Sequence, residues 1–196
     1  MNILITGGLG HIGSYLLNSI NKIKKLDKVY IIDNNSNNRI NSLFKFKKKK
    51  IKLIFGDLCD DHCFKEINHK IDIVLHLASI TNAEASVKEE KRVYKNNFGA
   101  FKNIINFSIK NNSKFIHISS TSVYGSQDKI IGENCKDLRP QSPYAITKLK
   151  EEKLVAKLCA EGRLKAITCR FGTIFGASPG MRFHTAVNKF CWQAVM

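Results

Sequence analysis

Short apolar runs alternate with longer segments of helical periodicity along the chain. The apolar runs predict six strands, near residues 2–6, 28–33, 51–55, 71–77, 113–119 and 164–169. Apolar residues at helical spacing predict helices near 11–24, 38–48, 60–68, 84–110, 142–161 and 182–195. Strands that alternate with helices are typical of a parallel sheet with helices on both faces. The pattern therefore predicts an α/β fold with three layers, built on a doubly wound parallel sheet.

The first predicted strand leads into a glycine-rich turn and then a helix. Gly7, Gly10 and Gly13 fall at this junction. In a dinucleotide-binding unit, the first such glycine permits a tight turn, the second lets the backbone approach a pyrophosphate, and the third lets the helix pack closely on the strand. The N-terminus of the following helix offers free N–H groups to phosphates. The arrangement predicts a dinucleotide site.

Asp33 ends the second predicted strand, twenty residues after Gly13. A carboxylate at this position accepts hydrogen bonds from the adenosine ribose hydroxyls and repels a 2′-phosphate. NAD is therefore favoured over NADP, although Arg39 lies close enough in the sequence to weaken the exclusion. The alternative is that Asp33 only opens the asparagine-rich turn at 34–38.

A tyrosine and a lysine lie four residues apart in the predicted helix 142–161. Tyr144 and Lys148 therefore project from the same face of that helix. An ammonium beside a phenol favours the phenolate, which can exchange a proton with a hydroxyl. Ser120 follows the predicted strand 113–119, at the carboxyl edge where a parallel sheet binds its ligand. Taken alone, the tyrosine and lysine could equally form a surface pair.

These motifs together resemble the extended short-chain dehydrogenase/reductase family, in particular its NAD-dependent nucleotide-sugar epimerases and dehydratases. The resemblance spans essentially the whole chain and rests on residues 6–13, 56–58, 76–79, 96–99, 120–125, 144–148 and 170–173. It implies a Rossmann fold and catalytic roles for Ser120, Tyr144 and Lys148. It implies cofactor contacts at Gly7, Gly10, His11, Ile12, Gly13, Asp33, Asn34, Asp57, Leu58, Leu77, Ala78, Ser79, Asn96, Tyr144 and Lys148. Substrate contacts are implied at Thr81, Ser120, Thr173 and Asn188, where Thr173 replaces the usual asparagine.

The reaction implied by the resemblance is transient oxidation of a sugar hydroxyl. Tyr144 takes the hydroxyl proton while hydride passes to NAD, and Ser120 steadies the developing carbonyl. Epimerisation is favoured over dehydration because Thr121 and Ser122 stand where the dehydratases carry an Asp-Glu pair. A reductase and a non-catalytic NAD-binding module are the alternatives; the module would not need all three catalytic residues.

Family members of this type are usually longer than this chain. We therefore expect an NAD-binding domain at 1–181, followed at 182–196 by the start of a truncated substrate-binding region, with most of the small substrate-binding subdomain missing. By family position, Arg182, His184 and Asn188 would approach a nucleotide sugar, with surface or capping roles as the alternative. A homodimer through the helices at 84–110 and 142–161 is expected by the same analogy.

The composition of the chain restricts its possible partners, its location and the chemistry of its cysteines. The net charge of +16 raises the alternative of a nucleic-acid binder, but the lysines outside the run at 45–52 are scattered, which favours a solvated surface. No apolar stretch is long enough to span a membrane, so we expect a cytoplasmic protein. The six cysteines have no paired spacing, which indicates reduced thiols and no metal site.

Overall fold

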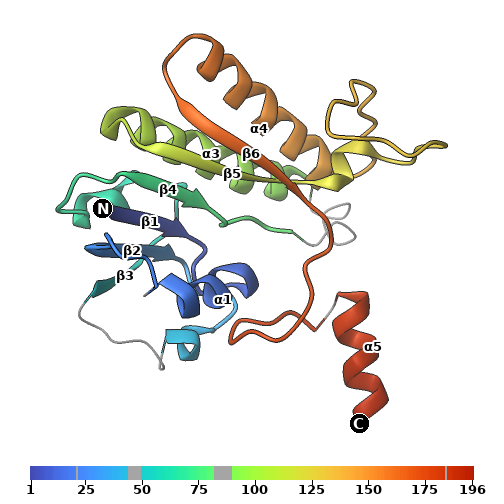
Figure 1. The fold of residues 1–196 in the computed structure, drawn as a ribbon, viewed down its shortest axis with the longest axis horizontal. Coiled ribbons are helices and arrows are strands. Elements are labelled where there is room, and N and C mark those ends of the chain that lie inside the picture. The colour runs from blue at the N-terminus through green and yellow to red at the C-terminus, as the bar shows by residue number, and fades with distance from the viewer. Residues whose placement is uncertain (21, 44–49, 82–89, 184) are drawn as a thin grey trace.

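One parallel sheet organises the chain, as the computed structural model of residues 1–20, 22–43, 50–81, 90–183 and 185–196 shows (Figure 1). Within these residues, the sheet has six strands in the order β3-β2-β1-β4-β5-β6. The strands are β1 (Asn2–Thr6), β2 (Lys28–Asp33), β3 (Ile51–Phe55), β4 (Ile73–His76), β5 (Lys114–Ser120) and β6 (Lys165–Phe171). Every pairing between neighbouring strands is parallel. The predicted parallel sheet is confirmed.

Helices cover both faces of this sheet. The α-helices of the described residues are α1 (His11–Ile20), α3 (Glu90–Asn111), α4 (Pro143–Ala160) and α5 (Ala186–Val195), and the short 3-10 helices are η1 (Ile40–Leu43), η3 (Asp61–Glu66) and η4 (Thr121–Tyr124). Figure 1 shows α3 and α4 on one side of the sheet and α1 on the other. The three-layer, doubly wound arrangement is therefore also confirmed. Figure 1 shows α5 apart from the sheet, after the long loop that follows β6.

The two hydrophobic cores follow from the period of two along the central strands. In β1, Leu4 packs into the core under α3 and α4, whereas Ile3 and Ile5 pack into the core under α1. Phe101 of α3 and Leu17 of α1 are fully buried on the two sides. Both faces of β1 are covered, and its three central residues, Ile3, Leu4 and Ile5, are all apolar, which is typical of a buried parallel strand.

Several predicted elements differ in extent from those observed. The segment 60–68 forms the 3-10 helix η3, which begins where the Asp60 side chain accepts a hydrogen bond from the His62 N–H. The helix expected at 11–24 ends at Ile20, because the chain turns so that Leu26 can enter the core. The helix expected at 182–195 begins at Ala186, and the Arg182 carbonyl accepts a hydrogen bond from the Asn188 side chain. The strands expected at 71–77, 113–119 and 164–169 are observed with ends shifted by one or two residues.

Two predicted helices fall partly outside the described residues. Of the segment 38–48, the structure describes 38–43, where η1 (Ile40–Leu43) replaces the expected α-helix, and residues 44–49 lie outside. Of the segment 84–110, residues 84–89 lie outside the described part, and α3 accounts for the rest.

The strand order places a switch point between β1 and β4. From β1 the chain winds outward to β2 and β3, then returns to β4 on the other side and continues to β5 and β6. The connections that leave the carboxyl ends of β1 and β4 therefore part in opposite directions, and open parallel sheets bind ligands in the crevice this leaves.

Candidate active site

The glycine turn after β1 leaves no room for a side chain at Gly7 or at Gly13. Gly7 has a φ of +67°, in the left-handed region, and a Cβ there would lie 2.7 Å from the backbone of Ala78. A Cβ on Gly13 would lie 2.6 Å from Gly8, which is where α1 packs against the turn. The Gly10 N–H donates to the Gly7 carbonyl at 3.1 Å, so the turn closes on itself. The tight turn and the close helix packing predicted from the sequence are both present.

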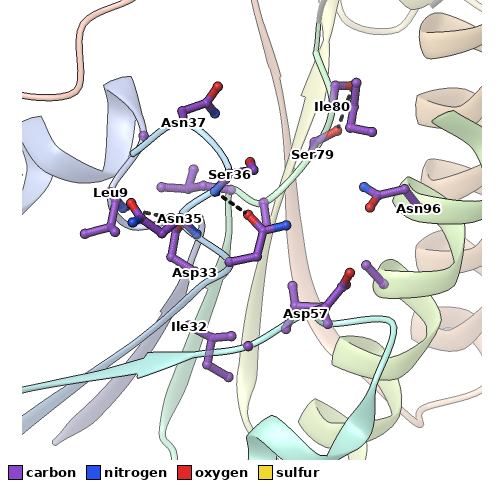
Figure 2. Close-up of a pocket in the computed structure, with 18 of the residues that line it drawn as sticks. Leu9, Ile32, Asp33, Asn35, Ser36, Asn37, Asp57, Ser79, Ile80 and Asn96 are labelled. Carbon is purple, nitrogen blue, oxygen red and sulfur yellow. Dashed lines mark hydrogen bonds between the residues drawn. The ribbon is translucent and has the colours of Figure 1, made fainter. Parts of the chain in front are cut away.

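Asp33 lies at one end of a pocket over the β1–β2–β4 edge (Figure 2). Its carboxylate accepts the Leu9 N–H at 3.0 Å and the Asn35 N–H at 2.8 Å. The second bond is the turn-opening contact that the alternative interpretation required. The carboxylate also lines the pocket, and an ionised carboxylate has lone pairs left for further donors. The two interpretations of Asp33 are therefore compatible.

This first pocket collects ten of the fifteen residues expected to contact the cofactor. Figure 2 shows Asp57, Ser79 and Asn96 around it. The expected residues that line it are Gly7, Gly10, Asp33, Asn34, Asp57, Leu58, Leu77, Ala78, Ser79 and Asn96. Arg39 and Arg182 also line it. From the sequence, Arg39 was considered only because it lies close enough to Asp33 to weaken the exclusion of NADP.

A second pocket adjoins the first on the β4–β5–β6 side. Gly7, Gly10 and Arg182 line both pockets, so the two form one continuous cleft. Among the expected residues, Gly7, Gly10, Leu77 and Ser79 line both parts, and those that line only this second part are His11, Ile12, Gly13, Thr81, Ser120, Tyr144, Lys148 and Thr173. The structure thus brings together in one cleft nearly all of the residues that sequence reasoning selected.

Ser120, Tyr144 and Lys148 reach this pocket from two elements. Ser120 ends β5 and caps η4, where its hydroxyl accepts the Ser122 N–H at 3.2 Å. Tyr144 and Lys148 project from the first two turns of α4, which begins with a Ser142 cap and Pro143. The Lys148 ammonium lies 5.9 Å from the centre of the Tyr144 ring.

Lys148 is buried, and its charge is balanced by a residue that sequence reasoning missed. Its Nζ donates to Glu151 Oε2 at 2.8 Å, with both side chains almost fully buried. Burial alone would lower the pKa of Lys148, but the Glu151 carboxylate and the adjacent Tyr144 raise it above the usual lysine value. Glu151 lies three residues after Lys148, on the same side of the helix, which was the available signal.

Two buried histidines lie beside this pair. His117 Nε2 donates to Glu151 Oε2 at 2.9 Å, and burial lowers the pKa of His117. His76 lines the second pocket, and its Nδ1 lies 2.8 Å from the Thr6 hydroxyl. Burial, together with the nearby Lys148 charge, lowers the pKa of His76 to about 3. Both imidazoles are therefore neutral at neutral pH.

The residues near α5 take mixed positions. Asn188 is buried, accepts the Gly176 N–H at 2.8 Å and donates to the Arg182 carbonyl at 2.7 Å. It therefore holds the loop before α5 and lines neither of the two pockets. Arg182 lines both pockets and donates to the Thr81 hydroxyl. His184 lies outside the described residues.

Comparison with known proteins gives this cleft a context. Residues 3–195 match the family described as "NAD dependent epimerase/dehydratase family". The chain belongs to the NAD-dependent epimerase/dehydratase family. The match covers nearly the whole sequence, and the resemblance inferred from the motifs is confirmed.

Individual members of the NAD-dependent epimerase/dehydratase family include epimerases and dehydratases. The chain is 32% identical over 162 residues to a UDP-glucose 4-epimerase of Yersinia enterocolitica, covering 79% of this chain and 48% of that protein. It is 31% identical over 193 residues to a dTDP-D-glucose 4,6-dehydratase of Dictyostelium discoideum, covering 89% of this chain and 44% of that protein. The chain spans about half the length of these relatives.

Solved structures of the NAD-dependent epimerase/dehydratase family share the fold. A UDP-N-acetylglucosamine 4-epimerase from Methanobrevibacter ruminantium M1, in complex with UDP-N-acetylmuramic acid, superimposes with a TM-score of 0.88 at 28% identity. The likeness covers 99% of this chain and 62% of that one. Among the described residues, no helix is long and apolar enough to cross a membrane. All six cysteines lie within the described residues and are free.

Proposed function

We propose that the chain binds NAD along the cleft and contributes the catalytic residues of an epimerase that acts on a nucleotide-diphosphate sugar through a transient keto-sugar. The observation that carries the proposal is the continuity of the cleft. Asp33 lies at one end, the glycine turn lies in the middle, and Ser120, Tyr144 and Lys148 lie at the other end. A dinucleotide needs this order of contacts from its adenosine ribose through the pyrophosphate to its nicotinamide.

The residues present fit NAD. An added Cβ at Gly7 or Gly13 would clash with the protein's own backbone, whereas at Gly10 only the Gly7 carbonyl lies near, at 3.2 Å. Gly10 lines both pockets, so its lack of a side chain suits the approach of a pyrophosphate to the turn. The N-terminus of α1 follows directly, and its first N–H groups are donors for phosphate oxygens. Asp33, with spare acceptor capacity, suits the ribose hydroxyls. When bound, NAD supplies the hydride acceptor and donor for the sugar carbon.

The chain's own residues would handle protons and orientation. Tyr144 Oη takes the proton of the sugar hydroxyl and later returns it, and the buried Lys148 ammonium lies 5.9 Å from the centre of the Tyr144 ring. The Ser120 hydroxyl donates to the oxygen that becomes the carbonyl. Lys148 also holds the hydroxyls of the nicotinamide ribose.

The residues around η4 favour epimerisation over dehydration. Thr121 and Ser122 follow Ser120, and neither hydroxyl is an acid or base at neutral pH. Ser122 is already engaged, since its hydroxyl donates to Ser120 Oγ at 2.9 Å. A dehydratase, a reductase and a non-catalytic NAD-binding module remain the alternatives; the similarity to a dehydratase favours the first of them.

The remaining proposals concern organisation. Residues 1–181 would form the NAD-binding domain, and 182–196 would begin the substrate-binding region. A homodimer through α3 and α4 is supported by Tyr94 and Ile146, which are exposed on neighbouring helices, and no nucleic-acid partner is proposed. A cytoplasmic location is supported by the six free thiols, which suit a reducing compartment.

The experiment incubates the chain, NAD and a panel of UDP-, dTDP- and GDP-sugars and follows new stereoisomers by NMR. NAD binding is measured in parallel by calorimetry. The expected result is one new epimer, lost in Tyr144→Phe while NAD affinity stays nearly unchanged. A 4-keto-6-deoxy product would favour the dehydratase. NAD binding with no turnover on any sugar would favour the non-catalytic module, and absence of NAD binding would overturn the proposal.

A further inference from the structure

A buried carboxylate lies behind the proposed catalytic lysine. Glu151 projects from α4 one turn after Lys148, and its side chain is 1% exposed. Its Oε2 accepts two hydrogen bonds, from Lys148 Nζ at 2.8 Å and from His117 Nε2 at 2.9 Å. Its Oε1 is buried and has no partner among the described residues. Burying an ionised carboxylate costs free energy unless an opposite charge and hydrogen bonds compensate for the lost solvation.

The charges around Glu151 leave Lys148 as its one close cationic partner among the described residues. Lys148, Tyr144 and Glu152 face this region from α4, His117 from β5 and His76 from β4. Both histidines are neutral because burial lowers their pKa values. Glu152 pairs instead with Arg170, at 2.6 Å. One buried cation is therefore balanced by one buried anion.

The hydrogen bonds also fix the direction of the carboxylate. A neutral His117 that donates through Nε2 must accept at Nδ1, where the Thr168 hydroxyl lies 3.3 Å away. His117 and Thr168 are register partners in β5 and β6, so the sheet holds the imidazole in place. Glu151 Oε2 is thereby anchored to the sheet, and Lys148 Nζ is anchored to Glu151.

We propose that Glu151 is a positioning residue, which, held by His117, keeps the Lys148 ammonium charged and in place at the wall of the cleft. An ammonium has three N–H donors, and Glu151 takes one of them. The other two are available to a ribose hydroxyl and to Tyr144 in the pocket that Lys148 lines. The catalytic meaning of this role rests on the proposed function, whereas the charge-holding role does not.

The test follows the ionisation of Lys148 itself, by the ¹³Cε NMR titration of the lysine side chains. The Lys148 resonance is identified as the one missing from Lys148→Met. In Glu151→Gln, which keeps the side-chain shape but removes the charge, this resonance should titrate at least one pH unit lower than in the wild type. The matched control is Glu152→Gln, which removes the neighbouring carboxylate; because Glu152 raises the Lys148 pKa less than Glu151 does, the control should lower the titration much less than Glu151→Gln. Glu151→Asp should restore most of the wild-type behaviour.

The outcomes separate this inference from the proposed function. An unchanged Lys148 titration in Glu151→Gln would overturn the positioning role, whatever the activity. If that variant does not fold, the wild type decides: titration above the usual lysine range supports the role, and titration well below it overturns the role. Where the wild type turns over a sugar, Glu151→Gln should lower kcat at least tenfold at neutral pH with a much smaller change in KM. A shifted titration in a protein with no turnover would retain the positioning role and count against the proposed function alone.

Discussion

Replacing Gly7 with alanine tests the packing of the glycine turn against the loop after β4. Gly7 has a φ of +67°, and a Cβ there would lie 2.7 Å from the Ala78 backbone. Gly162, after α4, is a matched control because its φ is +68° and nothing lies within 4 Å of its added Cβ. The two substitutions thus share the same backbone strain and differ in contact.

The expected magnitudes follow from this difference. An alanine in the left-handed region costs about 1 kcal/mol, so Gly162→Ala should lower the free energy of unfolding by about that amount. Gly7→Ala adds a clash with backbone that cannot rotate away, worth about 1–3 kcal/mol, for a total of about 2–4 kcal/mol. The loss of unfolded-state entropy is common to both variants and cancels in the comparison. For a chain of this size each kcal/mol lowers Tm by about 2–4 °C.

Urea denaturation followed by circular dichroism measures both free energies, and calorimetry measures NAD affinity. Gly7→Ala should also weaken NAD binding, because the turn must shift away from the pyrophosphate position, whereas Gly162→Ala should not. Equal destabilisation by the two substitutions would mean that the turn does not pack against the backbone of residue 78, and would contradict this prediction.

Three further predictions concern charges and thiols. The folded-state pKa of His76 is lowered to about 3, below its ordinary value of 6.5, so the contribution of His76 to stability is complete above pH 6.5 and is lost as the pH falls toward 3. Tm should therefore fall between pH 6.5 and 5, and it should fall less steeply in His76→Gln. An identical slope of Tm against pH in the two proteins would contradict this. Glu152 accepts two hydrogen bonds from Arg170, at 2.9 and 2.6 Å, so Glu152→Gln should cost about 1–2 kcal/mol in urea denaturation, and an unchanged midpoint would count against the pair. Burial, with Asp60 nearby, raises the pKa of the Cys63 thiol to about 11. At pH 8 a thiol reagent should therefore modify the exposed Cys191 well before Cys63, as read by mass spectrometry, and equal rates would exclude the buried position.

The parts of the fold set by local pattern were predictable from the sequence. Gly7, Gly10 and Gly13 predict the turn because residues with side chains fit its backbone conformation and close contacts poorly. The apolar strands predict a sheet that is covered on both faces. Tyr144 and Lys148 share a helix face through their spacing alone. These sequence patterns depend only on residues close together in the chain, so they can be recognised without knowing the tertiary contacts.

The features that depend on distant partners were not predictable. Glu151 is an ordinary helical glutamate in the sequence, and only the sheet register that brings His117 beside it makes it a buried, anchored carboxylate. Asn188 was expected at the substrate by family position, but its amide is engaged by the backbone of residues 176 and 182, a loop contact with no local signature. The predicted helix ends were wrong because they also depend on distant contacts. The first helix ends earlier than predicted, since the chain turns to place Leu26 in the core.

The central claim is that NAD lies along the cleft with its nicotinamide end beside Tyr144 and Lys148. A crystal structure of the chain grown with NAD tests it most directly. We expect the adenosine ribose on the Asp33 carboxylate, the pyrophosphate over the glycine turn, and the nicotinamide ribose within hydrogen-bond distance of Lys148 Nζ. A cofactor bound elsewhere, or one whose nicotinamide points away from the Tyr144 hydroxyl, would contradict it.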